Sequence, residues 1–483
     1  MKENKTNLKQ GINRREFLSL SALGLASFTI LPSWSMQGVR IAPSDRVVMG
    51  FIGPGRQGSG DFRSFSGAPG LQVAACSDVD SMKITRFQNS VTAWQEQMGM
   101  NKRCDAYENY EKLLERKDID AVEVATPDHW HALPTIHACQ AGKDVYVQKP
   151  LSYTIVEALA MAEAARVNKR VVQVGSQQRS SGEFQKAIEL VQNGTIGHIE
   201  RIHARVGDPP TPYNLPEQPI PANLNFNLWM GPLNDPKIHY NDDICPPISL
   251  NPVRSEALWG AWRWYREMGN GYTADWGAHH FDIAQAAIGM DGSGPVEFIP
   301  QGYRGARYNH MRYANGIIMS EEPYLDDNDS ARGIKFFGTK GWIEVARGYL
   351  ACSVPNVVPE NLAGNRPAAR NANATPQAQQ TQANAATAQR TTQAAEPRTT
   401  ASPHMQNFID CVRSRKKPIA TVEFGASTAI LCCNVNLALE LGRPVKWDPA
   451  TLSYGDDKEA RAHRLYNYQY RAPYTLPYSC SYI

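Results

Sequence analysis

Two aspartates and two adjacent histidines lie close together in the segment GYTADWGAHHFDIAQ, residues 271–285. Asp275 precedes His279 by four residues and Asp282 follows it by three, so a helix places all three on one side. Such a cluster could bind a metal ion, move a proton, or satisfy its own hydrogen bonds within a core. Neighbouring side chains on a helix point about 100° apart, so His279 and His280 reach one ion poorly, and we expect no metal. Asp275 and His279 are the favoured working pair, and Asp282 is expected to orient the His279 ring.

A lysine stands where a predicted strand ends. The segment VQKP places Lys149 at the carboxyl end of that strand, which is the edge where open α/β sheets bind ligands. In a partly dry cleft the pKa of a lysine can fall, and its ammonium can hydrogen-bond a substrate hydroxyl. Taken alone, Lys149 is more often an ordinary surface lysine, so its weight depends on the residues that it meets.

A glycine pattern follows a short apolar run near the start of the chain. The run 47–52 predicts a buried strand, and Gly53, Gly55 and Gly58 then form G-x-G-x-x-G before a predicted helix. In this context the first glycine allows a tight turn, the second lets the backbone approach a pyrophosphate, and the third lets the helix pack closely. The pattern therefore predicts a dinucleotide site; the alternative is a purely structural turn.

An acidic residue after the next predicted strand bears on the choice of dinucleotide. Asp78 is placed to accept hydrogen bonds from an adenosine ribose and would repel a 2′-phosphate, so NAD is favoured over NADP. Arg56 moderates this preference, because its guanidinium could bind a phosphate. The alternative role of Asp78 is that of a helix N-cap.

Strands and helices alternate over residues 46–168, which predicts an α/β fold with a doubly wound parallel sheet of the Rossmann type. Short apolar runs bounded by glycine or proline predict strands, and apolar spacings of three and four predict helices. The predicted strands are 47–52, 71–78, 119–127, 144–150 and 170–176, and the predicted helices begin near 58 and cover 131–143 and 154–169.

The rest of the chain divides into a domain and two special segments. Residues 169–453 are expected to form a domain for substrate binding and oligomerisation. Within it, residues 360–402 are rich in Ala, Gln, Asn and Thr and are predicted to be a disordered, low-complexity insertion. Residues 454–483 form a tyrosine-rich arm, which is expected to pack on its own domain or on a neighbouring subunit.

The first 35 residues resemble a targeting segment. Arg14 and Arg15 precede an apolar stretch, 17–31, that is shorter than the ~20 residues of a spanning helix. A twin arginine before a mild apolar core resembles a twin-arginine signal peptide over residues 1–35, which predicts an exported, periplasmic protein that carries its cofactor already bound. An ordinary secretory signal and an uncleaved anchor are the alternatives.

Bulk composition excludes some classes. The 483 residues carry a net charge of only +3, which gives no basis for a nucleic-acid partner. Nine cysteines in a chain of this size do not form a disulfide framework. No membrane partner is expected once the signal is removed.

Several motifs follow one another in a familiar order: GFIGPGRQG, CSDVD, VATPDHWH, VQKPLS, VGSQQR and GYTADWGAHHFD. Together they resemble the Gfo/Idh/MocA oxidoreductases, from about residue 46 to 350 and again in the helices after 404. The resemblance implies a Rossmann domain followed by an α/β domain with a large, mostly antiparallel open sheet. It also implies hydride transfer between bound nicotinamide and a sugar or polyol carbon, and a homo-oligomer, dimer or tetramer.

The same resemblance assigns catalytic roles. His279 takes the hydroxyl proton, Lys149 holds the same oxygen and stabilises negative charge, and Asp275 orients and polarises this group.

It also assigns binding residues. Thr126 and Pro127 match the nicotinamide-side loop, and His131 follows at a familiar spacing. Arg179 matches a substrate-side arginine. Gln148 stands where the family has a glutamate, which removes a negative charge beside Lys149 and leaves that cofactor contact in doubt.

Aromatic residues and arginines precede the histidine motif. Trp262, with Arg263 and Trp264 beside it, and Arg266 could bind a sugar, since rings stack on sugars and arginines bind hydroxyls; core aromatics with a salt-bridged arginine are an equal alternative. The first hypothesis is an exported NAD-dependent dehydrogenase of a sugar, glycoside or cyclitol. The alternatives are a redox glycosidase on the same fold and a non-catalytic sugar-binding protein.

Overall fold

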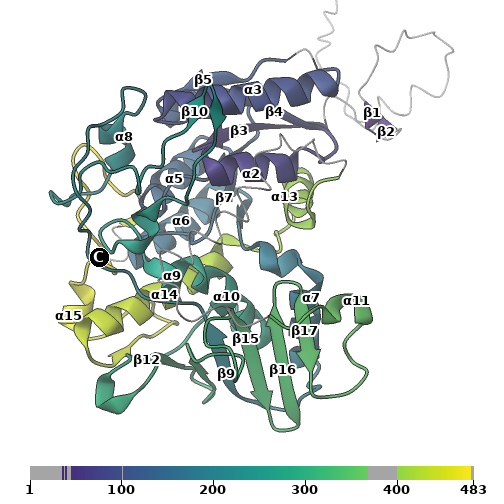
Figure 1. Ribbon diagram of the computed structural model, residues 1–483, viewed down its shortest axis with the longest axis vertical. Helices are drawn as coiled ribbons and strands as arrows, with labels where there is room; N and C mark the ends of the chain where they lie inside the picture. The colour runs from purple at the N-terminus through teal and green to yellow at the C-terminus, as the bar shows by residue number, and fades with distance from the viewer. Residues whose placement is uncertain (1–34, 37–38, 41–44, 101, 368–399, 480–483) are drawn as a thin grey trace, which may run out of the picture.

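The computed structural model describes residues 35–36, 39–40, 45–100, 102–367 and 400–479 (Figure 1). All of the predicted signal peptide except its last residue lies outside these ranges, as do residues 368–399 of the predicted insertion.

The predicted parallel sheet is confirmed. Six strands pair side by side, and all of their pairings are parallel. Their near-continuous apolar runs suit strands that are buried on both faces. In spatial order they are β5 (Asp105–Tyr107), β4 (Leu71–Ser77), β3 (Val47–Ile52), β6 (Ala121–Val124), β7 (Asp144–Val147) and β8 (Val172–Val174). Strand β8 lies beyond residue 168, so the sheet extends past the end that we expect for this domain.

Helices cover both faces of this sheet, as a doubly wound fold requires. One face is covered by α2 (Arg56–Phe65), α3 (Ser81–Gln97) and α13 (Pro403–Ser414). The other is covered by α4 (Tyr110–Leu114), α5 (Ala132–Gln140) and α6 (Ile155–Asn168). Helix α13 comes from far along the chain and packs Phe408 against Phe65 of α2, with ring centroids 6.1 Å apart. The N-terminal domain therefore borrows a helix from residues that we assign to the second domain.

A second sheet of eight strands follows, and it is mostly antiparallel as expected. Only β14 and β9 pair in parallel. In spatial order the strands are β17 (Tyr349–Cys352), β16 (Gly341–Ala346), β15 (Gly333–Gly338), β9 (Ile199–Arg205), β14 (Ile318–Ser320), β13 (His310–Arg312), β12 (Glu297–Ile299) and β18 (Val445–Lys446). One side is covered by α7 (Gly182–Gln192), α10 (Gly277–Ala287) and α14 (Val422–Leu441).

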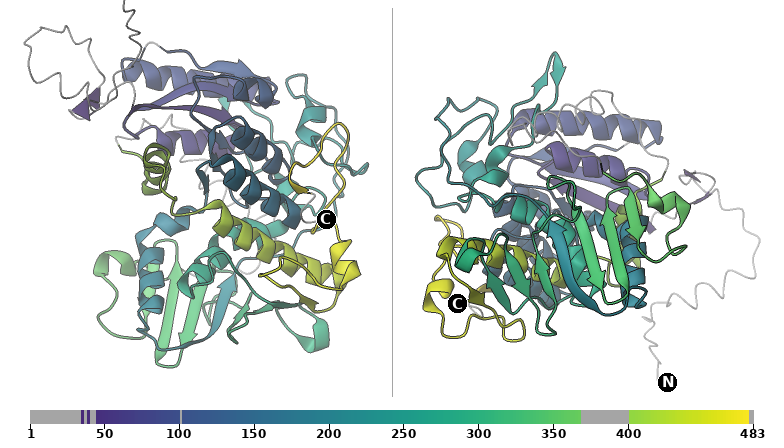
Figure 2. Two further views of the ribbon diagram at one scale, coloured as in Figure 1. Left: turned by 180° about the vertical axis from the view of Figure 1, so that it is seen from behind. Right: turned by 60° about the horizontal axis from the view of Figure 1, so that its bottom comes forward.

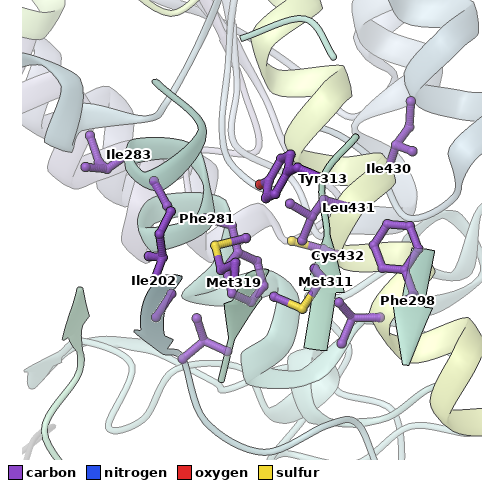
Figure 3. Close-up of a cluster of buried hydrophobic side chains, with 14 of the residues drawn as sticks. Ile202, Phe281, Ile283, Phe298, Met311, Tyr313, Met319, Ile430, Leu431 and Cys432 are labelled. Carbon is purple, nitrogen blue, oxygen red and sulfur yellow. The ribbon is translucent and has the colours of Figure 1, made fainter. Parts of the chain in front are cut away.

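Helix α14 joins the two halves of the molecule (Figure 2). Its first turns place Val422, Ala426 and Ala429 in the core of the parallel sheet, and residues 430–438 continue into the core of the second sheet. Figure 3 shows Leu431 and Cys432 of this helix beside side chains from the second sheet and α10. The helix is long and apolar enough to cross a membrane, but 83% of its most apolar window is buried inside the protein, which is the position of a core helix.

Part of the predicted insertion is folded. Residues 360–363 form helix α11 (Glu360–Ala363), and Leu362 packs against the core of the second sheet. Arg366 pairs with Asp327 at 2.6 Å. We therefore correct the start of the insertion. Leu362, the one large apolar residue in the segment, anchors it.

The tyrosine-rich arm packs on its own chain over the residues described. Tyr466 stacks edge-on against Tyr454, and the Tyr470 hydroxyl donates to the Glu157 carboxylate of α6.

The remaining elements are short. They are β1 (Ser35–Met36), β2 (Val39–Arg40), α8 (Phe226–Met230), β10 (Ser249–Leu250), β11 (Val253–Arg254), α9 (Gly271–Asp275) and α15 (Lys458–Arg461), with short 3-10 turns at Asp128–Trp130, Gln177–Ser180, Ala261–Trp264 and Tyr303–Gly305.

Candidate active site

The glycine turn between β3 and α2 has the shape that a pyrophosphate needs. Gly53 has φ +79°, and a Cβ there would stand 2.9 Å from the backbone of Thr126. A Cβ on Gly58 would stand 2.8 Å from the Gly53 carbonyl, so this glycine lets α2 approach the turn. Nothing lies within 4 Å of a Cβ on Gly55, which is the N-cap of α2. The open side of the turn thus faces a helix N-terminus, which favours an anion.

The turn opens into a cavity of about 610 Å³ that also collects most of the predicted cofactor residues. Asp78 follows β4 and lines the cavity, and Thr126 and Pro127 line it after β6. Burial raises the pKa of the Asp78 carboxyl to about 6. Asp80, not Asp78, caps α3, accepting from the Met82 amide at 2.9 Å. Asp78 Oδ1 accepts from the Asp80 amide at 3.0 Å, and the side chain lines the cavity.

The wall opposite the parallel sheet comes from residues that sequence reasoning missed. Trp259 lies in the loop before α9, and its ring centroid is 4.5 Å from the Arg56 guanidinium carbon. The C-terminal arm contributes Pro473, Tyr474 and Thr475, and Tyr474 packs edge-on against Trp130 with centroids 5.3 Å apart. No local motif marks these contacts, because they join segments more than 200 residues apart.

Two residues predicted to contact the cofactor instead form side-chain hydrogen bonds within the protein. The ring nitrogens of His131 lie 2.9 Å from the Thr126 carbonyl and 2.7 Å from the Pro150 carbonyl. Gln148 is buried, and its side-chain amide donates to Asp61 at 2.5 Å. Both residues hold the ends of β6 and β7 in place, so we correct their role from cofactor binding to positioning.

A second cavity of about 720 Å³ adjoins the first, and both are lined by Thr126, Trp262 and Arg263. The three predicted catalytic side chains meet here. Lys149 lies two residues after the end of β7 and is joined to Pro150 by a cis peptide bond. Asp275 ends α9, and His279 lies in the first turn of α10.

Lys149 and Asp275 are in direct contact. The Lys149 ammonium donates to Asp275 Oδ1 at 2.7 Å and to its main-chain carbonyl at 3.1 Å. Burial alone would raise the pKa of the Asp275 carboxyl, but Lys149 and Arg263 outweigh burial and hold it below its usual value. The Asp275 carboxylate is therefore ionised, and it fixes the position of the lysine.

His279 is buried, and neither of its ring nitrogens is hydrogen-bonded within the residues that the structure describes. Burial, followed by the charges of Arg347 and Lys149, lowers the pKa of His279 well below 6.5. The imidazole is thus neutral, with a nitrogen free to accept a proton. Asp275 contacts Lys149 rather than His279, so its orienting role applies to the lysine.

Arg179 and Asp282 have partners other than the predicted ones. The Arg179 guanidinium donates to both oxygens of Asp282, at 2.7 and 2.8 Å, and to both oxygens of Asp291, at 2.6 and 3.1 Å. These four bonds use four of its five N–H donors, and the side chain is 6% exposed and does not line the cavity. We therefore correct Arg179 from a substrate contact to a structural one, and Asp282 from a partner of His279 to a partner of Arg179.

Replacing Arg179 by methionine should lower the free energy of unfolding by about 3–5 kcal/mol, because it leaves the Asp282 carboxylate buried without its cation. NAD affinity of the folded protein should not change. Urea unfolding measures the first quantity and calorimetric titration the second. Arg312→Met, at an exposed ion pair with Glu297, is the matched control and should cost less than about 1 kcal/mol. Unchanged stability with impaired sugar binding would restore the ligand role.

The residues predicted to bind a sugar lie in different cavities. Trp262 is buried, lines both cavities and carries Arg263 over its ring at 4.2 Å. Arg266 pairs with Glu267 at 3.3 Å and lines a different cavity, so it is corrected to a salt-bridged arginine. Its near neighbour Arg263, in the 3-10 turn Ala261–Trp264, is the one that lines the site, whereas Arg266 lies beyond the end of that turn.

Other lining residues carry no sequence signal. Arg332 and Arg347 come from the loop before β15 and the end of β16, and Tyr272 and Trp276 flank Asp275. Only the aromatic pair, inside the histidine segment, could have been found by position.

The fold and the glycine turn define a two-domain dinucleotide-binding protein. Residues 47–176 match the model of the Gfo/Idh/MocA group, described as "Oxidoreductase family, NAD-binding Rossmann fold", so this part of the chain is similar to the NAD-binding domain of that oxidoreductase family.

Curated relatives match over a limited length. A glycosyl hydrolase family 109 protein of Shewanella pealeana is 30% identical over 39% of this chain and 44% of its own length. Myo-inositol 2-dehydrogenase of Thermotoga maritima is 30% identical over 34% of this chain and 46% of its own length. The chain therefore matches less than half the length of each of these relatives.

Solved structures share the fold over most of the chain. The WlbA dehydrogenase of Bordetella pertussis, in complex with NADH and UDP-GlcNAcA, superposes with a TM-score of 0.52 at 15% identity, covering 83% of this chain and 97% of that one. A levoglucosan dehydrogenase, in complex with NADH and levoglucosan, gives a TM-score of 0.51 at 17% identity, covering 83% and 99%.

Proposed function

We propose that this protein is an NAD-dependent oxidoreductase that acts on a hydroxyl-bearing carbon of a sugar, glycoside or cyclitol. The observation that carries the proposal is the meeting of Lys149, Asp275 and His279 in a cavity that adjoins the glycine-lined cofactor cavity. The match of residues 47–176 to an NAD-binding oxidoreductase domain supports it.

The side chains divide the chemistry between them. Bound NAD supplies a hydride acceptor, held by the glycine turn and by Asp78. The neutral imidazole of His279 accepts the proton of the substrate hydroxyl. The Lys149 ammonium donates a hydrogen bond to the same oxygen and stabilises its growing negative charge, while Asp275 keeps the ammonium in place.

A redox glycosidase is the second candidate, and the curated relatives favour it, since several of them are named glycosyl hydrolase family 109 proteins. In this reaction a ring carbon is oxidised, the aglycone is eliminated and the carbon is reduced again, so there is no net redox change. The same three side chains serve both reactions, because each begins with removal of a hydroxyl proton.

We also propose export in folded form and assembly as a homo-oligomer. Arg14 and Arg15 before a mild apolar stretch support export, and an exported enzyme must keep its cofactor, since free nicotinamide is scarce outside the cytoplasm.

The test begins with purified protein that is denatured and assayed for released NAD. Native protein is then given monosaccharides and aryl glycosides without added cofactor. A stoichiometric burst of NADH with a free sugar supports the dehydrogenase, and cleavage of a glycoside without net reduction supports the glycosidase. Absence of NAD, together with failure to bind added NAD, would contradict both and favour a non-catalytic sugar-binding protein.

A further inference from the structure

The substrate cavity contains an excess of positive charge. Four cationic side chains line it: Lys149, Arg263, Arg332 and Arg347. Three carboxylic acids line it as well: Asp61, Asp128 and Asp275. A cavity for a neutral sugar needs hydroxyl partners but no surplus of cations, so the state of each acid matters.

The acids do not balance the cations. Asp275 is ionised and is already paired with Lys149 at 2.7 Å, with Arg263 3.9 Å away. Asp61 is buried and receives hydrogen bonds from the amides of Gln57 and Gln148. Burial raises the pKa of Asp128 to about 8, so this acid is protonated at neutral pH. No carboxylate of the cavity is therefore left for Arg347, which lies beside Arg332.

Those two arginines lie around a single indole ring. The guanidinium carbons of Arg332 and Arg347 lie 4.9 and 4.8 Å from the centroid of the Trp276 ring. Arg332 also donates to the Val206 carbonyl and contacts the Tyr272 ring. Arg347 forms no ion pair among the described residues; its Nε is 3.2 Å from the Gln178 side chain once that amide is oriented to accept. A buried guanidinium without an ion pair is stabilised by an anion that enters the cavity beside it.

The cofactor does not explain these charges. Arg332 and Arg347 line the substrate cavity and not the cofactor cavity, whereas Arg263 lines both and is available to either ligand. The cavity also presents flat aromatic surfaces, since Trp264 stacks on Tyr272 with centroids 4.0 Å apart. Rings of this kind pack against the apolar face of a pyranose, as the hydrophobic surface of an aromatic side chain allows.

We propose that the substrate is a sugar with an anionic substituent, in the first place the carboxylate of a hexuronic acid, and that Arg347 binds this anion. The planar guanidinium of Arg347 matches a carboxylate with two parallel hydrogen bonds. The inference rests on the proposed function, because it names the substrate class of the same site. A sulfate ester presents the same charge and is the second source of such an anion.

The test compares matched glycosides that differ only at C6. Methyl glucuronide, galacturonide and mannuronide are titrated calorimetrically into the NAD-loaded protein, each against its neutral hexoside and against the 6-sulfate. At least one uronide should bind about tenfold more tightly than its neutral counterpart, and added salt should weaken that preference. A larger gain for the 6-sulfate would identify sulfate as the anion.

Variants then assign the residues. Arg347→Gln should remove most of the preference for the uronide over its neutral counterpart. Arg347→Lys should retain part of that preference, since it keeps the positive charge but cannot form two parallel hydrogen bonds. Arg307→Gln, at a surface arginine that lines neither cavity, is the control and should change nothing.

Two results would overturn the inference. One is equal or tighter binding of the neutral member in every pair, and the other is a preference for the anion that survives Arg347→Gln. These outcomes are separate from failure of the proposed function. Selective binding of a uronide without any hydride transfer would contradict the proposed enzymatic function and support the anion site. Turnover of neutral glycosides alone would support the proposed function and contradict the anion site.

Discussion

Replacement of Lys149 by methionine is expected to lower the rate of hydride transfer by about 10²–10³-fold while leaving NAD bound. The ammonium is the proposed hydrogen-bond donor to the reacting oxygen, and methionine keeps most of the apolar stem while removing the charge. Asp275 would retain Arg263 at 3.9 Å, so the carboxylate is not left without a cation and the fold should survive. The NADH burst measures the first quantity, and NAD released on denaturation measures the second.

A matched control shows whether loss of any lysine charge, rather than loss of the Lys149 charge in the cavity, lowers the rate. Lys186→Met removes a partly exposed lysine that pairs with Glu189 three residues away on α7, outside both cavities, and should leave the burst unchanged. Retention of more than about a tenth of the activity in Lys149→Met would show that this ammonium does not stabilise the reacting oxygen.

Replacement of His279 by alanine should lower the rate by about 10²–10⁴-fold, the range for loss of a general base. The neighbouring His280 provides the control, because it is equally buried but its Nδ1 lies 3.0 Å from the Arg205 carbonyl and it does not line the cavity. His280→Asn is expected to lower stability and to keep the rate per folded molecule. Equal loss of rate in the two variants would indicate a structural effect rather than proton transfer.

The acid side of the pH profile gives a second readout for His279. A base must be neutral to accept a proton, and the pKa of His279 in the folded protein is lowered well below 6.5 by burial and by neighbouring cations. The rate of oxidation should therefore hold as the pH falls through 6.5 and should decline only at lower pH. A decline centred at 6.5 or above, measured by the initial burst across that range, would contradict this assignment.

Local signals explain what could be predicted. The apolar run at 47–52 matches β3 residue for residue, and the glycine turn has the positive φ and close approaches that the spacing requires. Lys149, Asp275 and His279 also meet as expected. Each of these features depends on a few neighbouring residues, on strand ends that a parallel sheet brings to one edge, or on a motif that keeps its spacing.

Long-range contacts explain why the roles of Arg179 and Arg266 were predicted wrongly. Arg179 stands at a plausible position after β8, but α10 and the loop that follows it present Asp282 and Asp291 to its fork, which a sequence pattern cannot show. Arg266 and Arg263 are three residues apart, and only the path of the chain decides which one faces the cavity.

The sequence by itself determined a Rossmann domain with an NAD site, together with the types of side chain available for proton transfer, because these depend on local backbone geometry and on the chemistry of single residues. The tertiary structure decided which charges are free. It paired Asp275 with Lys149 and Arg179 with two aspartates, and it placed Arg347 in the cavity without a carboxylate partner among the described residues. Whether a charged side chain is a ligand or a structural partner depends on what lies within a few ångströms of it, and segments hundreds of residues apart supply those neighbours.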